Sequence, residues 1–211
     1  ALNKVCRCGF KHNEQSVRVV EVLEKQGEGL NLTWEVIDGI RNHKSAGMPA
    51  TLEGQIVRLS DKIAYVNHDI DDAIRAGSLR ESDLPGSAHR VLGENHSARI
   101  ETLVHDMIET SARLDDIQMS QPVWDAMMEL RAFLFQNVYT AEPVMQEVRK
   151  AKHLVEDLFD YFVRHYDQIP AEVRAISDGD PLRAVTDHVA GMTDRYATNF
   201  FKNMFVPQSF R

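Results

Sequence analysis

Residues 51–77 leave the chain few alternatives to a helical fold. Apolar side chains recur there every three or four positions, at Leu52, Ile56, Leu59, Ile63, Val66, Ile70 and Ile74. At about 100° per residue they share one side of an α-helix, and a polar set falls opposite, namely Asp61, Tyr65, His68, Asp69 and Asp72. Thr51 can cap the start of this helix and Gly77 can end it. The spacing predicts one long amphipathic helix with a buried face.

The remaining segments show the same helical spacing. We expect helices over residues 13–25, 33–43 and 142–166 and from Ser97 onward. Pro122 and Pro181 each suit a first helical turn and open two more helices. No stretch shows the sustained alternation of apolar and polar residues that is typical of a β-strand. The sequence therefore predicts an all-α fold.

Length and composition set broad limits on function. With 211 residues the chain makes one domain, or a domain with a subdomain, and can bury a sizeable core. The net charge of −8 argues against a general nucleic-acid binder, because such proteins need a basic surface to displace counterions. No apolar run approaches the roughly 20 residues that cross a bilayer, and the N-terminus has no signal-peptide pattern. We therefore expect no membrane partner and a cytoplasmic location.

The polar face of the long helix has two interpretations. A charge-rich face is usually solvated and carries no chemistry. Such a face normally mixes Glu, Lys and Arg, whereas here Tyr65, His68 and several short Asp side chains share one stripe. Asp loses less rotamer entropy than Glu when it is fixed on a metal or a hydroxyl group. A functional site on this face is therefore plausible.

Two segments of this helix, Leu59–Tyr65 and His68–Gly77, resemble a motif of the HD-domain deoxynucleoside triphosphate triphosphohydrolases, the dGTPase-like enzymes. Further similar segments follow the same order along the chain: Gly9–Ser16, Leu32–Val36, Leu130–Tyr139 and Ala190–Ala197. Several segments with compatible spacing are a more specific signal than any one of them. The resemblance implies part of an HD-domain-like helical bundle over residues 1–115 and a C-terminal helical subdomain over residues 116–211.

The same resemblance implies a divalent metal. Asp61 corresponds to the last of four metal ligands in the HD-domain enzymes. The other three, a histidine and a His-Asp pair, would lie upstream of Ala1. We therefore expect this chain to be a C-terminal portion that lacks most of the metal site. Histidine and carboxylate ligands suit Mn, Mg, Fe or Ni, and the sequence does not choose among these metals.

The resemblance also assigns residues to the substrate. His12 corresponds to a histidine beside the triphosphate, which can act as a general acid or stabilise transition-state charge. Lys62 resembles a lysine that contacts the phosphates. Tyr65 resembles a tyrosine that packs on the deoxyribose, and Asp69 a carboxylate that accepts a hydrogen bond from the sugar 3′-hydroxyl. Arg195 is a candidate for a second phosphate contact.

Each of these residues also has a structural interpretation. A histidine just before a helix, like His12, is commonly a cap or a surface residue. Arg195 can equally pair with Asp194 or with a neighbour on its helix. These alternatives stay open on the sequence alone.

Several other residues are interpreted as structural. Cys6 and Cys8 are too close together for an ordinary disulfide and too few for a zinc site, so we expect reduced thiols. His43, Lys44 and His68 are expected to be structural or solvated. The aromatic residues of the C-terminal half sit on helical stripes and are expected in the core or in a subunit interface: Phe159, Tyr161, Phe162, Phe200, Phe201 and Phe205.

The function implied by the resemblance is metal-dependent hydrolysis of a deoxynucleoside triphosphate to deoxynucleoside and inorganic triphosphate. This chain can be a truncated and inactive portion of such an enzyme. The alternative is a non-catalytic helical module that binds nucleotides or assembles with partners. A third hypothesis, an HD phosphodiesterase for another nucleotide, would lack the set formed by Lys62, Tyr65 and Asp69. Relatives are commonly oligomeric, so we expect a homo-oligomer.

Overall fold

The computed structural model describes residues 1–7, 9–44, 47–177 and 179–207. Over these residues the regular structure consists of α-helices with a few 3-10 and π-helical turns, and it includes no β-strand. The all-α prediction is confirmed. No helix within the same residues is long and apolar enough to span a membrane.

The chain forms two compact units, and the first joins Ala1–Thr33 to the residues from Gln146 on. Helix α9 begins just before Gln146 and continues through this unit. The helices of the first unit are α1 (Leu2–Val5), α2 (His12–Arg18), the π-helical turn η1 (Val19–Leu23), α3 (Glu24–Gly27), α9 (Glu142–Arg164), the 3-10 turn η4 (Tyr166–Gln168), α10 (Ala171–Ile176), α11 (Pro181–Ala190) and α12 (Asp194–Phe205).

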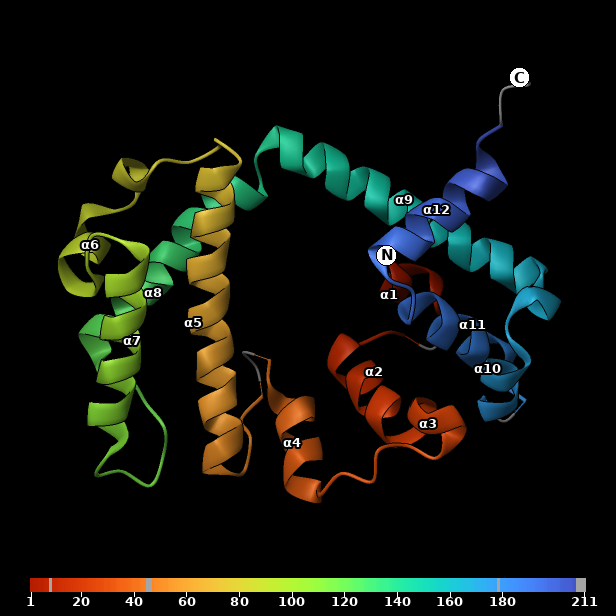
Figure 1. Ribbon diagram of the computed structural model, residues 1–211, viewed down its shortest axis with the longest axis horizontal. Helices are drawn as coiled ribbons and strands as arrows, with labels where there is room; N and C mark the ends of the chain where they lie inside the picture. The colour runs from red at the N-terminus through yellow and green to blue at the C-terminus, as the bar shows by residue number, and fades with distance from the viewer. Residues whose placement is uncertain (8, 45–46, 178, 208–211) are drawn as a thin grey trace. The chain divides into compact units, whose positions relative to one another are not determined.

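The second unit is Trp34–Met145. Its helices are α4 (Trp34–Asn42), α5 (Leu52–Arg75), the 3-10 turn η2 (Glu81–Asp83), α6 (Gly86–Leu92), α7 (His96–Ser111), α8 (Gln121–Leu134) and the π-helical turn η3 (Phe135–Tyr139). Helix α5 packs against α4, α7 and α8 (Figure 1). We expect a domain boundary between residues 115 and 116 from the family resemblance, not from the compactness of the chain. This boundary stays a prediction.

Local signals place the ends of α5 as the sequence predicts. The hydroxyl oxygen of Thr51 accepts a hydrogen bond of 3.1 Å from the backbone N–H of Gly54 and caps the first turn. At the other end Gly77 has φ of +71°, a backbone conformation that glycine adopts without strain. The N–H of Ser78 then donates to the carbonyl of Ala73, which closes the helix. The predicted helix is confirmed.

The prediction of one helix over residues 13–25 is wrong at its C-terminal end. Helix α2 passes into η1, and the chain then turns at Lys25 and Gln26, which have φ of +52° and +60°. The N–H of Leu30 donates to the carbonyl of Val20 at 2.7 Å, so the chain folds back onto η1. Left-handed backbone at two successive non-glycine residues is uncommon, and helical spacing cannot predict it.

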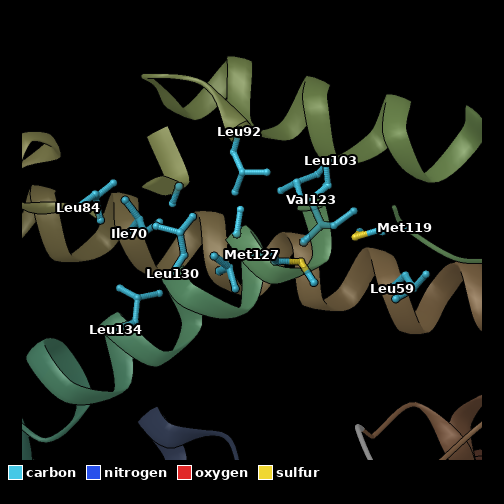
Figure 2. Close-up of a cluster of buried hydrophobic side chains, with 14 of the residues drawn as sticks. Leu59, Ile70, Leu84, Leu92, Leu103, Met119, Val123, Met127, Leu130 and Leu134 are labelled. Carbon is cyan, nitrogen blue, oxygen red and sulfur yellow. The ribbon is translucent and has the colours of Figure 1, made fainter. Parts of the chain in front are cut away.

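The core of the second unit lies between α5, α7 and α8 (Figure 2). From α5 it receives Leu59, Ile63, Val66 and Ile70, all of them on the predicted apolar face and all buried. Helix α8 contributes a facing stripe of Val123, Ala126, Met127, Leu130 and Leu134. Residues at three- and four-residue spacing on two helices thus close one apolar layer.

Leu52 and Ile56 correct the predicted buried face, because both are exposed. In the first turns of α5 the buried residues are instead Gly54 and Gln55. A Cβ atom added to Gly39 of α4 would lie 3.7 Å from the Cα of Gly54, so the two helices approach closely at their glycines. This contact with α4 sets which side of the first turns is buried, and the apolar spacing alone does not reveal it.

The first unit has its own core, made mainly by α9 and α11. Phe159, Phe162 and Ile169 pack there with Cys6 and with Ala184, Val185 and Val189. Phe159 and Phe162 therefore belong to the core, as expected. Cys6 is buried and forms no disulfide with a described residue, as expected, and Cys8 lies outside the described residues.

Candidate functional site

Helix α5 brings most of the predicted site residues to one face. Asp61, Lys62 and Asp69 are partly buried there, while Tyr65 is 63% exposed. Asp61, Tyr65 and Asp69 are four positions apart, which on a helix places them one above another, and Lys62 follows Asp61 at the edge of this stripe. The stripe therefore exists as the spacing predicts, and the roles of its members stay predictions.

Asp69 is bound by a tyrosine that the sequence interpretation missed. The phenol of Tyr139 donates a hydrogen bond to Oδ2 of Asp69. Tyr139 is the last residue of η3, the π-helical turn that continues α8. Burial, together with the hydrogen bond and the charge of Asp69, raises the pKa of Tyr139 above its usual value. The phenol thus stays protonated at neutral pH and remains a donor.

Lys62 lies among other cations. Burial lowers the pKa of Lys62, and the positive charges of Arg58 and Arg131 lower this pKa further, while Asp61 opposes the effect. The ammonium group of Lys62 is 3.5 Å from the carbonyl oxygen of Arg58. The guanidinium of Arg58 also donates to the carbonyl of Lys44 at 3.4 Å. We call Arg58, Lys62 and Arg131 the cation cluster.

The cation cluster adjoins an open hollow of about 370 Å³ on α8 and η3, whose lining includes both Arg131 and Tyr139. The whole lining is Met128, Arg131, Ala132, Phe135, Gln136 and Tyr139. The hollow thus shares Arg131 with the cation cluster, and it shares Tyr139 with the hydrogen bond to Asp69. The sequence interpretation used residues 130–139 for the resemblance but assigned no role to Arg131 or Tyr139.

The outer part of the polar stripe is structural or solvated. Asp72 forms an exposed ion pair of 3.2 Å with Arg75 on the same helix. His68 stacks on His96 with 6.4 Å between the ring centres, and His96 lies 3.0 Å from Asp71. This matches the structural interpretation of His68.

Asp61 alone does not make a metal site. Across residues 1–7, 9–44, 47–177 and 179–207, no three His, Cys, Asp or Glu side chains come together in a way that could hold a metal ion. A single carboxylate supplies one ligand, whereas HD-type chemistry requires several. The residues present therefore do not fit the expected metal, and we assign no chemical step to it.

His12 and Arg195 belong to the first unit, and their position relative to α5 stays a prediction because the placement of the two units is not determined. His12 is the exposed first residue of α2, and its carbonyl accepts a hydrogen bond of 2.8 Å from Ser16. Arg195 is exposed in the first turn of α12, whose N-cap is Thr193.

The helix that begins at His12 is anchored by a buried carboxylate. Asp187 of α11 is 3% exposed and accepts hydrogen bonds from the amide of Gln15 at 2.8 Å and from Nε of Arg18 at 2.9 and 3.0 Å. Nη2 of Arg18 lies 2.8 Å from the same carboxylate. We call Gln15, Arg18 and Asp187 the Asp187 network. It holds α2 against α11 with matched charges.

Comparison with known proteins identifies relatives over almost the whole chain. Residues 117–203 match a family described as a phosphohydrolase-associated domain. A deoxyguanosinetriphosphate triphosphohydrolase-like protein of Caldanaerobacter subterraneus is 51% identical over 207 residues, which are 98% of this chain and 61% of the relative. A protein of the same name from Clostridium perfringens is 46% identical over 217 residues, covering 98% of this chain and 64% of the relative.

A more distant relative with the same name, from Geobacter sulfurreducens, is 34% identical and covers 94% of this chain and 65% of its own length. The chain thus spans somewhat less than two thirds of the relatives that it matches. Over the part that it spans, it is similar to deoxyguanosinetriphosphate triphosphohydrolase-like proteins, and its C-terminal part matches the phosphohydrolase-associated domain.

Proposed function

We propose that the protein hydrolyses a deoxynucleoside triphosphate to deoxynucleoside and inorganic triphosphate, and that the polar face of α5 forms part of its substrate site. The observation that carries this proposal is the position of the cation cluster beside the Asp69–Tyr139 hydrogen bond. Cations suit the polyphosphate of a nucleotide, and a carboxylate suits a sugar hydroxyl. The match to the phosphohydrolase-associated domain supports the phosphohydrolase class, and the names of the relatives support the substrate.

The polyphosphate would lie on the cation cluster. Burial lowers the pKa of Lys62, and repulsion from Arg58 and from Arg131 lowers it further. A bound triphosphate would relieve this repulsion, because its charge is negative and its oxygens accept hydrogen bonds from all three groups. The arrangement therefore favours an anionic ligand over an empty site.

The sugar would lie at Asp69. Tyr139 holds one carboxylate oxygen of Asp69, and the other can accept the 3′-hydroxyl. Tyr65, one turn before Asp69, would pack against the deoxyribose. An added 2′-hydroxyl would then clash with the tyrosine ring or be left unpaired, which provides a route to rejecting ribonucleotides.

His12 would act as the general acid of the reaction. When water attacks the α-phosphorus, the bond from phosphorus to the 5′-oxygen breaks and that oxygen needs a proton. An imidazole, with an ordinary pKa near 6.5, can donate it. Arg195 would add a second phosphate contact. We also propose dependence on a divalent metal; Asp61 would supply one ligand, and the described residues do not supply the others.

The decisive experiment is phosphorus NMR of a dNTP mixture with Mn²⁺ and the full-length gene product. We expect release of inorganic triphosphate by the wild type and its loss in Asp61→Asn and Lys62→Met. Lys152→Met, which removes an exposed lysine of α9, is the matched control and should keep full activity. Comparing dGTP with GTP in Tyr65→Ala then tests the sugar contact.

A wild type that binds dNTPs without releasing triphosphate would contradict the proposal. The cation cluster would then belong to a nucleotide-binding module without turnover, which is the alternative function. Hydrolysis that yields a product other than triphosphate would favour a phosphodiesterase of the HD type.

A further inference from the structure

Helix α7 buries an arginine against α5, on the side opposite the polar face of α5. Arg99 is 1% exposed. Its Nε donates a hydrogen bond of 3.3 Å to Oδ1 of Asn67 on α5, and its Nη1 pairs with Glu81 in η2. Helices α5 and α7 pack against each other here (Figure 1). The guanidinium thus joins α7 both to α5 and to the segment that follows α5.

Burial of this guanidinium is costly. Nη2 of Arg99 is buried and makes no hydrogen bond with any described residue, and the side chain of Glu81 is 36% exposed. An incompletely paired buried charge destabilises a fold, and an apolar side chain of similar volume commonly packs in its place at lower cost. Stability therefore does not explain an arginine at this position, and the group that it holds offers a better reason.

The group that Arg99 holds is the amide of Asn67, which is fully buried. Because Nε of Arg99 is a donor, it fixes the oxygen of the amide toward α7 and turns Nδ2 back along α5. Nδ2 donates a hydrogen bond of 2.8 Å to the carbonyl of Ile63, four residues earlier. Side-chain bonds of this kind compete with the helix backbone and often bend the helix. Arg99 therefore fixes the local curvature of α5 through one amide.

The turn from Ile63 to Asn67 lies in the middle of the proposed substrate site. Lys62 immediately precedes this turn, Tyr65 lies within it, and Asp69 follows it by two residues. Asn67 is about 200° around the helix from Tyr65 and from Asp69, so it lies behind the face that would contact the sugar. A change of curvature in this turn would alter the separation between Lys62 and Asp69.

We propose that Arg99 is a positioning residue for the substrate site on α5. Through Asn67 it keeps the curvature at which Lys62 meets the polyphosphate while Asp69 meets the sugar. An error of about 1 Å in such a spacing can cost about a hundredfold in rate. The inference rests on the proposed function for its substrate, but the effect of Arg99 on the position of Asp69 can be measured without substrate.

The hydrogen bond from Tyr139 to Asp69 reports that position. Burial and this bond raise the pKa of Tyr139 above its usual value, while Arg131 opposes the effect. We expect Asn67→Leu and Arg99→Met to move Asp69 away from the phenol, so that Tyr139 titrates nearer the ordinary tyrosine pKa of about 10. NMR of the tyrosine ζ carbons in the full-length gene product follows the titration, and Tyr139→Phe identifies the signal.

Kinetics then separate positioning from stability. A variant that only unfolds more easily has fewer active molecules, which lowers the apparent kcat for dGTP and leaves KM unchanged. Asn67→Leu and Arg99→Met should instead raise KM about fivefold or more, because the two ends of the substrate no longer fit together. Arg99→Lys keeps the charge but lacks the second donor edge that reaches Asn67, so it should not restore KM.

Ser120→Ala is the matched structural control. The hydroxyl of Ser120 donates a hydrogen bond of 2.6 Å to Asp106, a carboxylate on the same helix as Arg99. Its loss should lower the stability of the second unit and leave both KM and the titration of Tyr139 unchanged. Circular dichroism of each variant confirms that it is folded, and Asn67→Leu provides the same test if Arg99→Met does not fold.

A lowered pKa of Tyr139 together with a raised KM in Asn67→Leu and Arg99→Met, both absent from Ser120→Ala, would support the proposal. A wild-type titration of Tyr139 and an unchanged KM in folded Arg99→Met would overturn it. If the wild type releases no triphosphate, the proposed function fails. The titration of Tyr139 alone then decides whether Arg99 places Asp69, so the two failures are distinguishable.

Discussion

The Asp187 network pairs a carboxylate with a guanidinium, whereas the cation cluster brings cations close to one another. In the first unit, Asp187 is surrounded by donors, and the positive charge of Arg18 matches its own. In the second unit, burial lowers the pKa of Lys62, and the positive charges of Arg58 and Arg131 lower it further, against the opposing charge of Asp61. A buried carboxylate that is paired with a guanidinium stabilises the packing of helices, whereas a partly buried lysine whose pKa is lowered by burial and by nearby cations costs stability. We infer that the first serves the fold and the second serves a ligand.

The largest effect should come from breaking the matched network. Asp187→Asn removes the carboxylate that neutralises Arg18, and we expect the free energy of unfolding of the first unit to fall by about 3 kcal/mol. Both tryptophans, Trp34 and Trp124, lie in the second unit, so far-UV circular dichroism must follow this transition. Asp160→Asn, an exposed carboxylate on α9, should change little. Equal losses in both variants would contradict a special role for Asp187.

A smaller effect should follow from removing the donor to Asp69. Tyr139→Phe keeps the ring but loses the hydroxyl, and we expect a loss of about 1.5 kcal/mol in the second unit because the hydrogen bond reaches a charged, partly buried group. Tryptophan fluorescence during urea unfolding measures this. Tyr65→Phe removes an exposed hydroxyl of the same unit that makes no hydrogen bond with a described residue, and it serves as the control.

The next effect is confined to acid pH and to the first unit. Burial lowers the pKa of His188, whose ring packs edge-on against Phe162 at 4.6 Å. The unfolded chain takes up a proton near pH 6.5 and the folded unit does not, so stability is complete above that pH and decreases as the pH falls below it. His188→Gln should reduce this decrease between pH 7 and 5. His153→Gln, an exposed histidine, should leave the pH profile unchanged.

The smallest effect is a gain in stability rather than a loss, and it tests the cation cluster. Lys62→Met removes one of three mutually repelling cations and keeps a long apolar side chain, so the unfolding midpoint of the second unit should rise slightly. Tryptophan fluorescence measures the shift, and Arg113→Met gives the baseline for an exposed cation of the same unit. A clear fall in stability would show that Lys62 serves the fold, and the contrast between the two units would disappear.

Helix positions were predictable because their signals are local. Thr51 and Gly77 delimit α5 through contacts within a few residues, and Pro122 and Pro181 lie in the first turns of α8 and α11. Burial of the first turns of α5 was not predictable, since it depends on the approach of Gly39 to Gly54. That contact joins two helices and leaves no trace in the apolar spacing of either.

The candidate site was predictable in part for the same reason. One helix carries Asp61, Lys62, Tyr65 and Asp69, so their common face follows from spacing. Arg131 and Tyr139 come from another helix, and only tertiary packing brings them to Lys62 and Asp69. His12 and Arg195 belong to the first unit and α5 belongs to the second, so spacing along one helix cannot predict whether they share a site. The metal, the homo-oligomer and the roles of all these residues stay predictions.

The π-helical turn before Tyr139 makes the sugar contact sensitive to chain length. Phe135–Tyr139 winds more widely than an α-helix and holds one more residue per turn than an α-helix would. Deleting a single residue there would restore the α-helical register and rotate the following side chains by about 100°. Tyr139 would then leave Asp69 without any change of residue type. Evolution could thus gain or lose this contact through one codon inserted or removed.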